Sequence, residues 1–149
     1  MLFSNSKWLS LYLKVLRFME TLFAKQDRLL SLTSTEIIRT LMYQINWDAQ
    51  LVAIKGPRGV GKTTLMLQYM KQHYEVYSRE VLYCTLDSVY FSNHTLLELV
   101  DVFVKNGGKH LFLDEVHKYP TWSKEIKEVY DMYPDLKVVF SASSLLNIL

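Results

Sequence analysis

Residues 50–70 read QLVAIKGPRGVGKTTLMLQYM, and this stretch decides the fold. An apolar run ends at Lys55, three glycines and a proline follow within six residues, and a helix-like pattern then resumes at once. Gly56, Gly61, Lys62 and Thr63 fit GxxxxGK[ST] between a predicted strand and a predicted helix, which is the setting of a phosphate-binding loop. We therefore expect this turn to hold phosphate groups.

The loop and the start of the helix after it offer several kinds of phosphate contact. Backbone N–H groups turn inward around the β-phosphate, and the helix adds its unpaired donors and the positive end of its dipole. Lys62 brings a cation to the β- and γ-phosphates, and the Thr63 hydroxyl is placed to ligate Mg²⁺. Arg58 is interpreted as a solvated loop residue, with contact to a phosphate or a neighbouring subunit as the alternative. The predicted nucleotide-binding residues are Gly56, Pro57, Arg58, Gly59, Val60, Gly61, Lys62, Thr63 and Thr64.

A second pattern, HLFLDE at residues 110–115, is an apolar strand that ends in two acids. A buried parallel strand accommodates carboxylates only at its C-terminal edge, where ligands bind in open α/β sheets. Asp114 is expected to hold the water shell of Mg²⁺ at the metal site, whereas Glu115 points to another side and is placed to orient or deprotonate an attacking water. Alone, this acid pair is only a weak indication of a metal site. Together with the glycine loop it is a strong one.

Apolar strands and helical patterns alternate along the chain, which predicts βαβ units and a three-layer α/β domain with a parallel sheet. Helix 33–45 is predicted from a capping box formed by Thr33 and Glu36, and helix 94–106 is expected to be capped from Ser92 or Asn93. Strands are predicted at 50–55, 80–87, 109–115 and 136–143, and the other helices at 62–74 and 121–133.

Residues 1–30 are predicted to be an amphipathic helical segment in front of a core at 31–149. Lys14 and Arg17 interrupt its apolar run well short of the roughly 20 residues of a spanning helix, and no cleavage site follows. We expect a docking face rather than a lipid anchor, and Met19 is an alternative start. The apolar set is Leu9, Tyr12, Leu13, Leu16, Met19 and Phe23.

The composition describes a globular chain of 149 residues, 50% hydrophobic and 21% charged. A formal net charge of +2 without a basic run does not indicate a nucleic-acid partner. The single cysteine, Cys84, lies in an apolar strand pattern and is interpreted as a buried thiol in a reducing compartment, which favours a cytoplasmic location. The histidines and the cysteine show no metal-ligand spacing.

Residues 26–149 resemble the predicted ATPases of the AAA+ superfamily found in bacteria and archaea, whose longer members carry a further C-terminal domain. The resemblance rests on AIKGPRGVGKTTLMLQY, LYCTLD, HLFLDEVHKYPTWSKEIKEVYD and KVVFSASSLL. It implies that residues 56–64 bind ATP, that Asp114 and Glu115 form the second acidic motif, and that Ser141 or Ser143 takes the sensor position on the next strand. Related chains favour Thr-Gly-Ser-Ser where residues 141–144 are Ser-Ala-Ser-Ser, and a serine retains the hydroxyl that this role needs.

The same resemblance implies a core with five parallel strands in the order 5-1-4-3-2, and the sequence supplies four of them. We therefore expect the order 1-4-3-2, with strand 50–55 left at an open edge, and interpret the chain as a truncated gene or a fragment. An open apolar edge favours self-association.

The predicted function is that of a domain that binds Mg·ATP and hydrolyses its β–γ bond with water. One alternative is a nucleotide-gated switch with negligible turnover, because the loss of an arginine finger alone lowers the rate by about 10³–10⁵. Another is a nucleic-acid-dependent motor, against which the weak net charge argues. Adenine and guanine are not distinguished by the sequence, which has no NKxD motif.

Overall fold

A computed structural model describes residues 5–143 of the chain; residues 1–4 and 144–149, which were included in the predicted N-terminal segment and core, lie outside the described residues. Within the described range, four parallel strands form one sheet in the order β1-β4-β3-β2, which confirms the predicted order. The strands are β1 (Leu51–Gly56), β2 (Val81–Thr85), β3 (His110–Asp114) and β4 (Lys137–Ser143).

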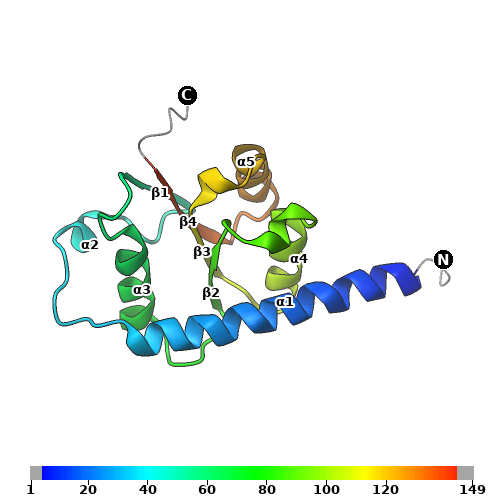
Figure 1. The fold of residues 1–149 in the computed structure, drawn as a ribbon, viewed down its shortest axis with the longest axis horizontal. Coiled ribbons are helices and arrows are strands. Elements are labelled where there is room, and N and C mark those ends of the chain that lie inside the picture. The colour runs from blue at the N-terminus through cyan, green and yellow to red at the C-terminus, as the bar shows by residue number, and fades with distance from the viewer. Residues whose placement is uncertain (1–4, 144–149) are drawn as a thin grey trace.

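Helices cover both faces of this sheet (Figure 1). One apolar cluster joins α3 (Lys62–His73) and the short α2 (Leu41–Gln44) to one face. The other cluster joins α1 (Asn5–Leu32), α4 (Leu96–Lys105) and α5 (Trp122–Met132) to the opposite face. Two 3₁₀ turns, η2 (Val89–Ser92) and η3 (Val116–Lys118), follow β2 and β3. The chain is a three-layer α/β domain, as the alternating pattern predicts.

Strand alternation decides which polar side chains share the α3 face of the sheet. Phe112 and Val139 pack in the α3 cluster, whereas their neighbours Leu111, Leu113 and Val138 pack on the other face. Successive strand residues point to opposite faces, so Asp114, two residues after Phe112, lies on the α3 side. The same period places Ser141 and Tyr83 there, because they follow Val139 and Val81 by two residues. Three strands thus direct a polar side chain toward the start of α3.

Helix α1 covers the β2 edge of the sheet with a buried amide. Gln26, which is 1% exposed, donates from Nε2 to the Val81 carbonyl at 3.1 Å and accepts the Tyr83 N–H on Oε1 at 2.7 Å. The side chain therefore satisfies two groups of β2 that a neighbouring strand would otherwise pair. No helix in residues 5–143 is long and apolar enough to cross a membrane.

The buried face of α1 differs in part from the predicted one. Met19 and Phe23 are buried as expected, and Tyr12 and Leu16 pack against the core, but Leu9 and Leu13 are exposed by 48% and 47%. The reason is that the N-terminal part of α1 projects beyond α4 (Figure 1). The helical spacing of apolar residues therefore continues into a part of α1 that does not pack on the core. The residues that complete the buried face are Val15, Leu22 and Gln26.

The predicted helix at 33–45 is wrong except for its last turn, α2. The Thr33 hydroxyl donates to the Leu29 carbonyl at 2.7 Å, so it closes the end of α1 instead of capping a new helix. Gln68 of α3 then donates to the carbonyls of Ser34 and Ile37, both at 2.9 Å, and holds the segment as a loop. Tertiary hydrogen bonds outweigh the local capping pattern here.

The start of α4 also differs from the prediction. Residues 89–92 form η2, and the helix is capped by Thr95 rather than by Ser92 or Asn93. The Thr95 hydroxyl accepts the Glu98 N–H at 3.1 Å, which is the hydrogen bond of an N-cap.

Strand β1 lies at the edge of the sheet in residues 5–143, as predicted, with β4 as its neighbour. The Gln50 carbonyl accepts the Val138 N–H at 2.9 Å, and Leu51 pairs in register with Val138. In a parallel ladder alternate residues bond to one neighbour, so Leu51, Ala53 and Lys55 direct their backbone N–H and C=O groups away from β4. These three residues are also exposed.

Candidate functional site

Two glycines shape the loop between β1 and α3. Gly59 and Gly61 have φ values of 84° and 87°, a left-handed conformation that favours glycine. Gly61 is the N-cap residue of α3, and no side chain caps the helix at this position. The loop thus delivers the chain directly to the N-terminus of α3, with the positive end of the helix dipole at its mouth.

Lys62 folds back over this loop. Its side chain is buried, with 9% of the residue exposed, and Nζ donates to the carbonyls of Gly56 and Pro57. The ammonium group is therefore held inside the turn rather than in solvent. Pro57, Arg58, Val60 and Thr64 are exposed along the outer side of the loop and the first turn of α3.

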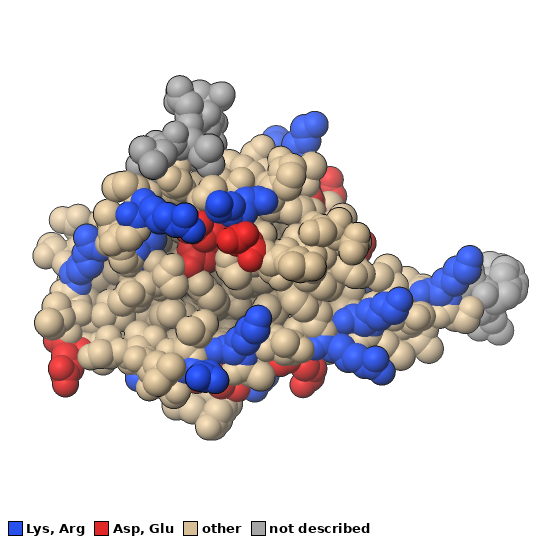
Figure 2. Space-filling model, viewed as in Figure 1, with Lys and Arg blue, Asp and Glu red and all other residues tan. Residues whose placement is uncertain are grey.

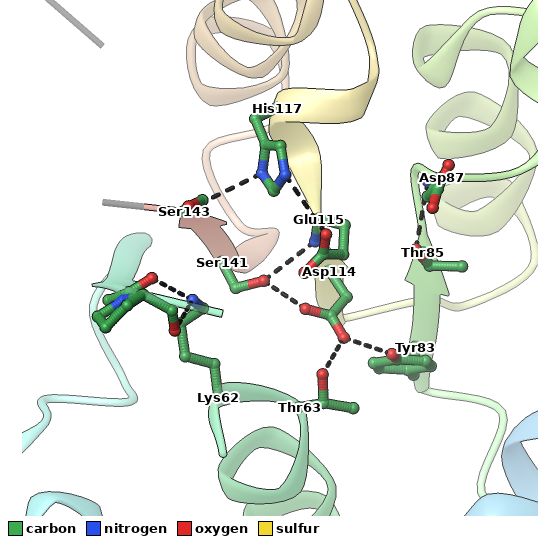
Figure 3. Close-up of polar contacts among 12 residues, drawn as sticks. Lys62, Thr63, Tyr83, Thr85, Asp87, Asp114, Glu115, His117, Ser141 and Ser143 are labelled. Atoms are coloured by element: carbon green, nitrogen blue, oxygen red, sulfur yellow. Dashed lines mark hydrogen bonds and ion pairs between the residues drawn. The ribbon is translucent and has the colours of Figure 1, made fainter. Parts of the chain in front are cut away.

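Asp114 is the centre of a group of hydroxyls at the carboxyl end of the sheet (Figure 3). It is only 3% exposed, and Oδ2 accepts the Thr63 hydroxyl at 2.5 Å and the Tyr83 hydroxyl at 2.6 Å. Oδ1 accepts the Ser141 hydroxyl. The structure thus joins the start of α3 to the ends of β3 and β4, and brings three of the predicted site residues into contact.

Glu115 points away from this group. Its backbone is left-handed, with φ 56° and ψ 43°, and its N–H donates to the Ser141 hydroxyl at 3.0 Å. Its carboxylate Oε2 lies 3.4 Å from His117 Nε2. The two acids therefore have different surroundings, which agrees with the expectation that they point to different sides. Ser141 contacts both acids, and Ser143 contacts His117 through its backbone N–H at 3.3 Å.

The sequence that forms this site also matches a known protein family. A family model described as AAA domain matches residues 48–149, from the start of β1 through the acids and β4. The chain belongs to the AAA domain family. The glycine loop at 56–64 and the acidic strand end therefore lie in a nucleotide-binding domain of this type.

Two further comparisons concern curated proteins and solved structures. A search of curated sequences finds no match. Among solved structures the AAA domain is similar to C. elegans PCH-2, with a TM-score of 0.45 and 16% identity. That alignment covers 87% of this chain and 37% of the PCH-2 chain, so this chain spans little more than a third of the PCH-2 chain.

Tyr83 is a residue of the AAA domain site that the sequence did not reveal. Burial, and after it the negative charge of Asp114, raise the pKa of Tyr83 above its ordinary value, so the hydroxyl stays protonated and donates to the carboxylate. The β2–β3 register pairs Tyr83 with Phe112 and Thr85 with Asp114. The apolar pattern of β2 alone gives no signal for this contact, because it depends on the pairing register.

Arg39 is the second residue that the sequence missed. Its Nη1 donates to the Val60 carbonyl, and the same atom lies 3.0 Å from the point where a Cβ on Gly61 would stand. The predicted helix at 33–45 concealed this contact, because Arg39 reaches the glycine loop only when residues 33–40 form a loop.

The electrostatic setting of the site is mixed. On the face shown in Figure 2, acidic side chains near the carboxyl ends of the strands are flanked by basic side chains. In residues 5–143 no three His, Cys, Asp or Glu side chains form a group that could hold a metal by themselves. A metal at this site of the AAA domain would need ligands other than these side chains alone, such as hydroxyls, waters and phosphates.

Proposed function

We propose that this AAA domain binds ATP together with Mg²⁺ and hydrolyses the β–γ phosphate bond with water. The observation that carries the proposal is the contact of Asp114 with Thr63. It joins the first helical turn after the phosphate-binding loop to an acid at the carboxyl end of a central strand, immediately before a second acid with a separate environment.

The phosphates are expected to lie on the loop 56–64. Its glycines leave the backbone N–H groups free of side-chain bulk, and α3 adds the positive end of its dipole. Lys62 Nζ is held by two loop carbonyls, and it needs only to exchange these acceptors for the more strongly charged β- and γ-phosphate oxygens.

The donor set fits Mg²⁺. Mg²⁺ prefers oxygen ligands and is usually held by one or two carboxylates together with phosphates and waters. The Thr63 hydroxyl and the Asp114 carboxylate supply two oxygens 2.5 Å apart, and Tyr83 and Ser141 fix the carboxylate in place. When bound, the ion would neutralise charge on the β- and γ-phosphates.

Glu115 is the proposed base for the attacking water. Its carboxylate lies 3.4 Å from His117 Nε2 and is partly accessible, with 25% of the side chain exposed. Ser141 is the better of the two sensor candidates, because its hydroxyl donates to the Asp114 carboxylate and accepts the Glu115 N–H. A buried free thiol, Cys84, supports placing this function in the reducing environment of the cytoplasm.

Calorimetric titration of the full chain with ATP and GTP, each with and without Mg²⁺, tests the proposal. ATP is expected to bind more tightly with Mg²⁺ than without it. Asp114→Asn should weaken this Mg²⁺ enhancement by about tenfold, because an amide oxygen is a poorer ligand for a hard cation than a carboxylate. Asp101→Asn, on the exposed side of α4, is the control for the loss of one carboxylate charge. No binding of either nucleotide to the folded chain would reject the proposal.

The open edge of β1 supports a further proposal, that the chain pairs with another copy through Leu51, Ala53 and Lys55. Ala53→Pro removes an outward N–H and places a ring where a neighbouring strand would lie, without removing a hydrogen bond to β4. Sedimentation at rising concentration should show association for the wild type and for the control Ala53→Val, and monomers for Ala53→Pro. A wild type that stays monomeric at high concentration would refute this pairing.

A further inference from the structure

The end of β4 holds Glu115 at two points. Ser141 and Ser143 are two residues apart, so they lie on the same side of the strand. The Ser141 hydroxyl accepts the Glu115 N–H at 3.0 Å, and the Ser143 N–H donates to His117 Nδ1 at 3.3 Å. His117 Nε2 in turn lies 3.4 Å from the Glu115 carboxylate. Figure 3 shows this path from β4 through His117 to Glu115.

The contact with Ser143 determines where the imidazole of His117 carries its proton. A ring nitrogen that accepts a hydrogen bond has no proton, so Nδ1 is the bare nitrogen and the proton of the neutral ring is on Nε2. Nε2 is the atom that faces the Glu115 carboxylate. The imidazole nitrogen that carries the proton is thus the one nearer to the acid, in a contact of 3.4 Å.

The backbone of Glu115 needs support of this kind. A residue other than glycine with φ 56° lies in a strained, left-handed region of backbone conformation, which persists only where neighbours hold it. Ser141 fixes the Glu115 N–H, and the Lys118 N–H donates to the Glu115 carbonyl at 3.0 Å within η3. His117 supplies the contact at the third group, the carboxylate, and its own side chain is only 12% exposed.

We propose that His117 is a positioning residue for Glu115. Its ring is held by the end of β4, and it in turn fixes the orientation of the Glu115 carboxylate, the proposed base. This rests on the proposed function of Glu115 in water activation. His117 itself touches neither Asp114 nor the phosphate-binding loop in any contact that the structure records for residues 5–143, so its effect falls on the orientation of the base and not on nucleotide binding.

Three variants separate the two contacts of His117. His117→Gln reaches the position of Nε2 with an amide N–H and keeps the contact with Glu115. His117→Asn places its carbonyl oxygen near the position of Nδ1 and keeps only the contact with Ser143. His117→Ala loses both.

We expect kcat to fall by about tenfold in His117→Ala and His117→Asn and by less in His117→Gln, with KM and the dissociation constant for ATP changed by less than about twofold. In the Glu115→Gln background, His117→Ala should cause no further loss, because it acts through the missing carboxylate. A kcat in His117→Ala equal to that of the wild type, or an equal fall in both backgrounds, would overturn the proposal.

A second measurement does not depend on turnover. In ¹⁵N NMR spectra of the full chain, His117 is expected to be the Nε2–H tautomer, and Glu115→Gln should shift its Nε2 resonance more than its Nδ1 resonance. The Nδ1–H tautomer, or an Nε2 resonance that does not respond to Glu115→Gln, would overturn the inference. Failure of ATP to bind would instead reject the proposed function, so the two failures are distinguishable.

Discussion

Lys62→Ala is expected to weaken ATP binding at least tenfold, and by about 100-fold if both phosphate contacts are lost. Each hydrogen bond from a charged group contributes about 1.5–3 kcal/mol, and no other side chain in the described part of the loop is placed to replace the ammonium inside the turn. The measurement is calorimetric titration with Mg·ATP.

The control for this change is Lys124→Ala, which removes the same charge from an exposed position on α5 and should leave the affinity unchanged. Thermal unfolding of both variants checks that the fold is intact. Lys62 lies at the mouth of α3 and outside both apolar clusters, so we expect little loss of stability. A folded Lys62→Ala chain with the affinity of the wild type would show that the nucleotide does not use this loop.

Glu115→Gln is expected to reduce ATP turnover by about 100-fold or more, within the range of general base catalysis, while ATP binding persists. The amide keeps the shape of the side chain but cannot take a proton from water. The measurement is phosphate release under single-turnover conditions, compared with ATP affinity of the same sample.

The matched control is Glu128→Gln, on an exposed position of α5. Equal turnover in Glu115→Gln and the wild type would remove Glu115 from the reaction. If both chains bind Mg·ATP tightly and release no phosphate, the domain is a nucleotide-gated switch rather than an ATPase.

The sequence predicted those parts of the molecule that local patterns determine. Local sequence patterns indicate the four strands, α3 and α5. They also indicate the glycine loop and the two acids at the end of β3. The period of two along the strands then implies that Asp114 and Ser141 share a face, and both are found in one hydrogen-bonded group.

Features that depend on contacts between distant segments could not be predicted in this way. Thr33 carries a capping signal, but a hydroxyl serves equally well to close the end of the helix before it. The apolar period of α1 does not tell where the core beneath it ends, so Leu9 and Leu13 were expected to be covered. Tyr83 and Arg39 join the site through the β2–β3 register and through the loop after α1, neither of which has a local signature.

The amide of Gln26 limits how many copies of the chain can join edge to edge. A sheet with two bare edges can add units without end and grow into a fibre, whereas here one edge has its Val81 and Tyr83 groups occupied by a side chain from α1. In residues 5–143 the two edges of the sheet therefore differ: β1 has no side chain bonded along its outer backbone groups, whereas two groups of β2 are occupied. If copies pair through β1 as proposed, the occupied β2 edges face outward and favour a closed pair over a growing fibre.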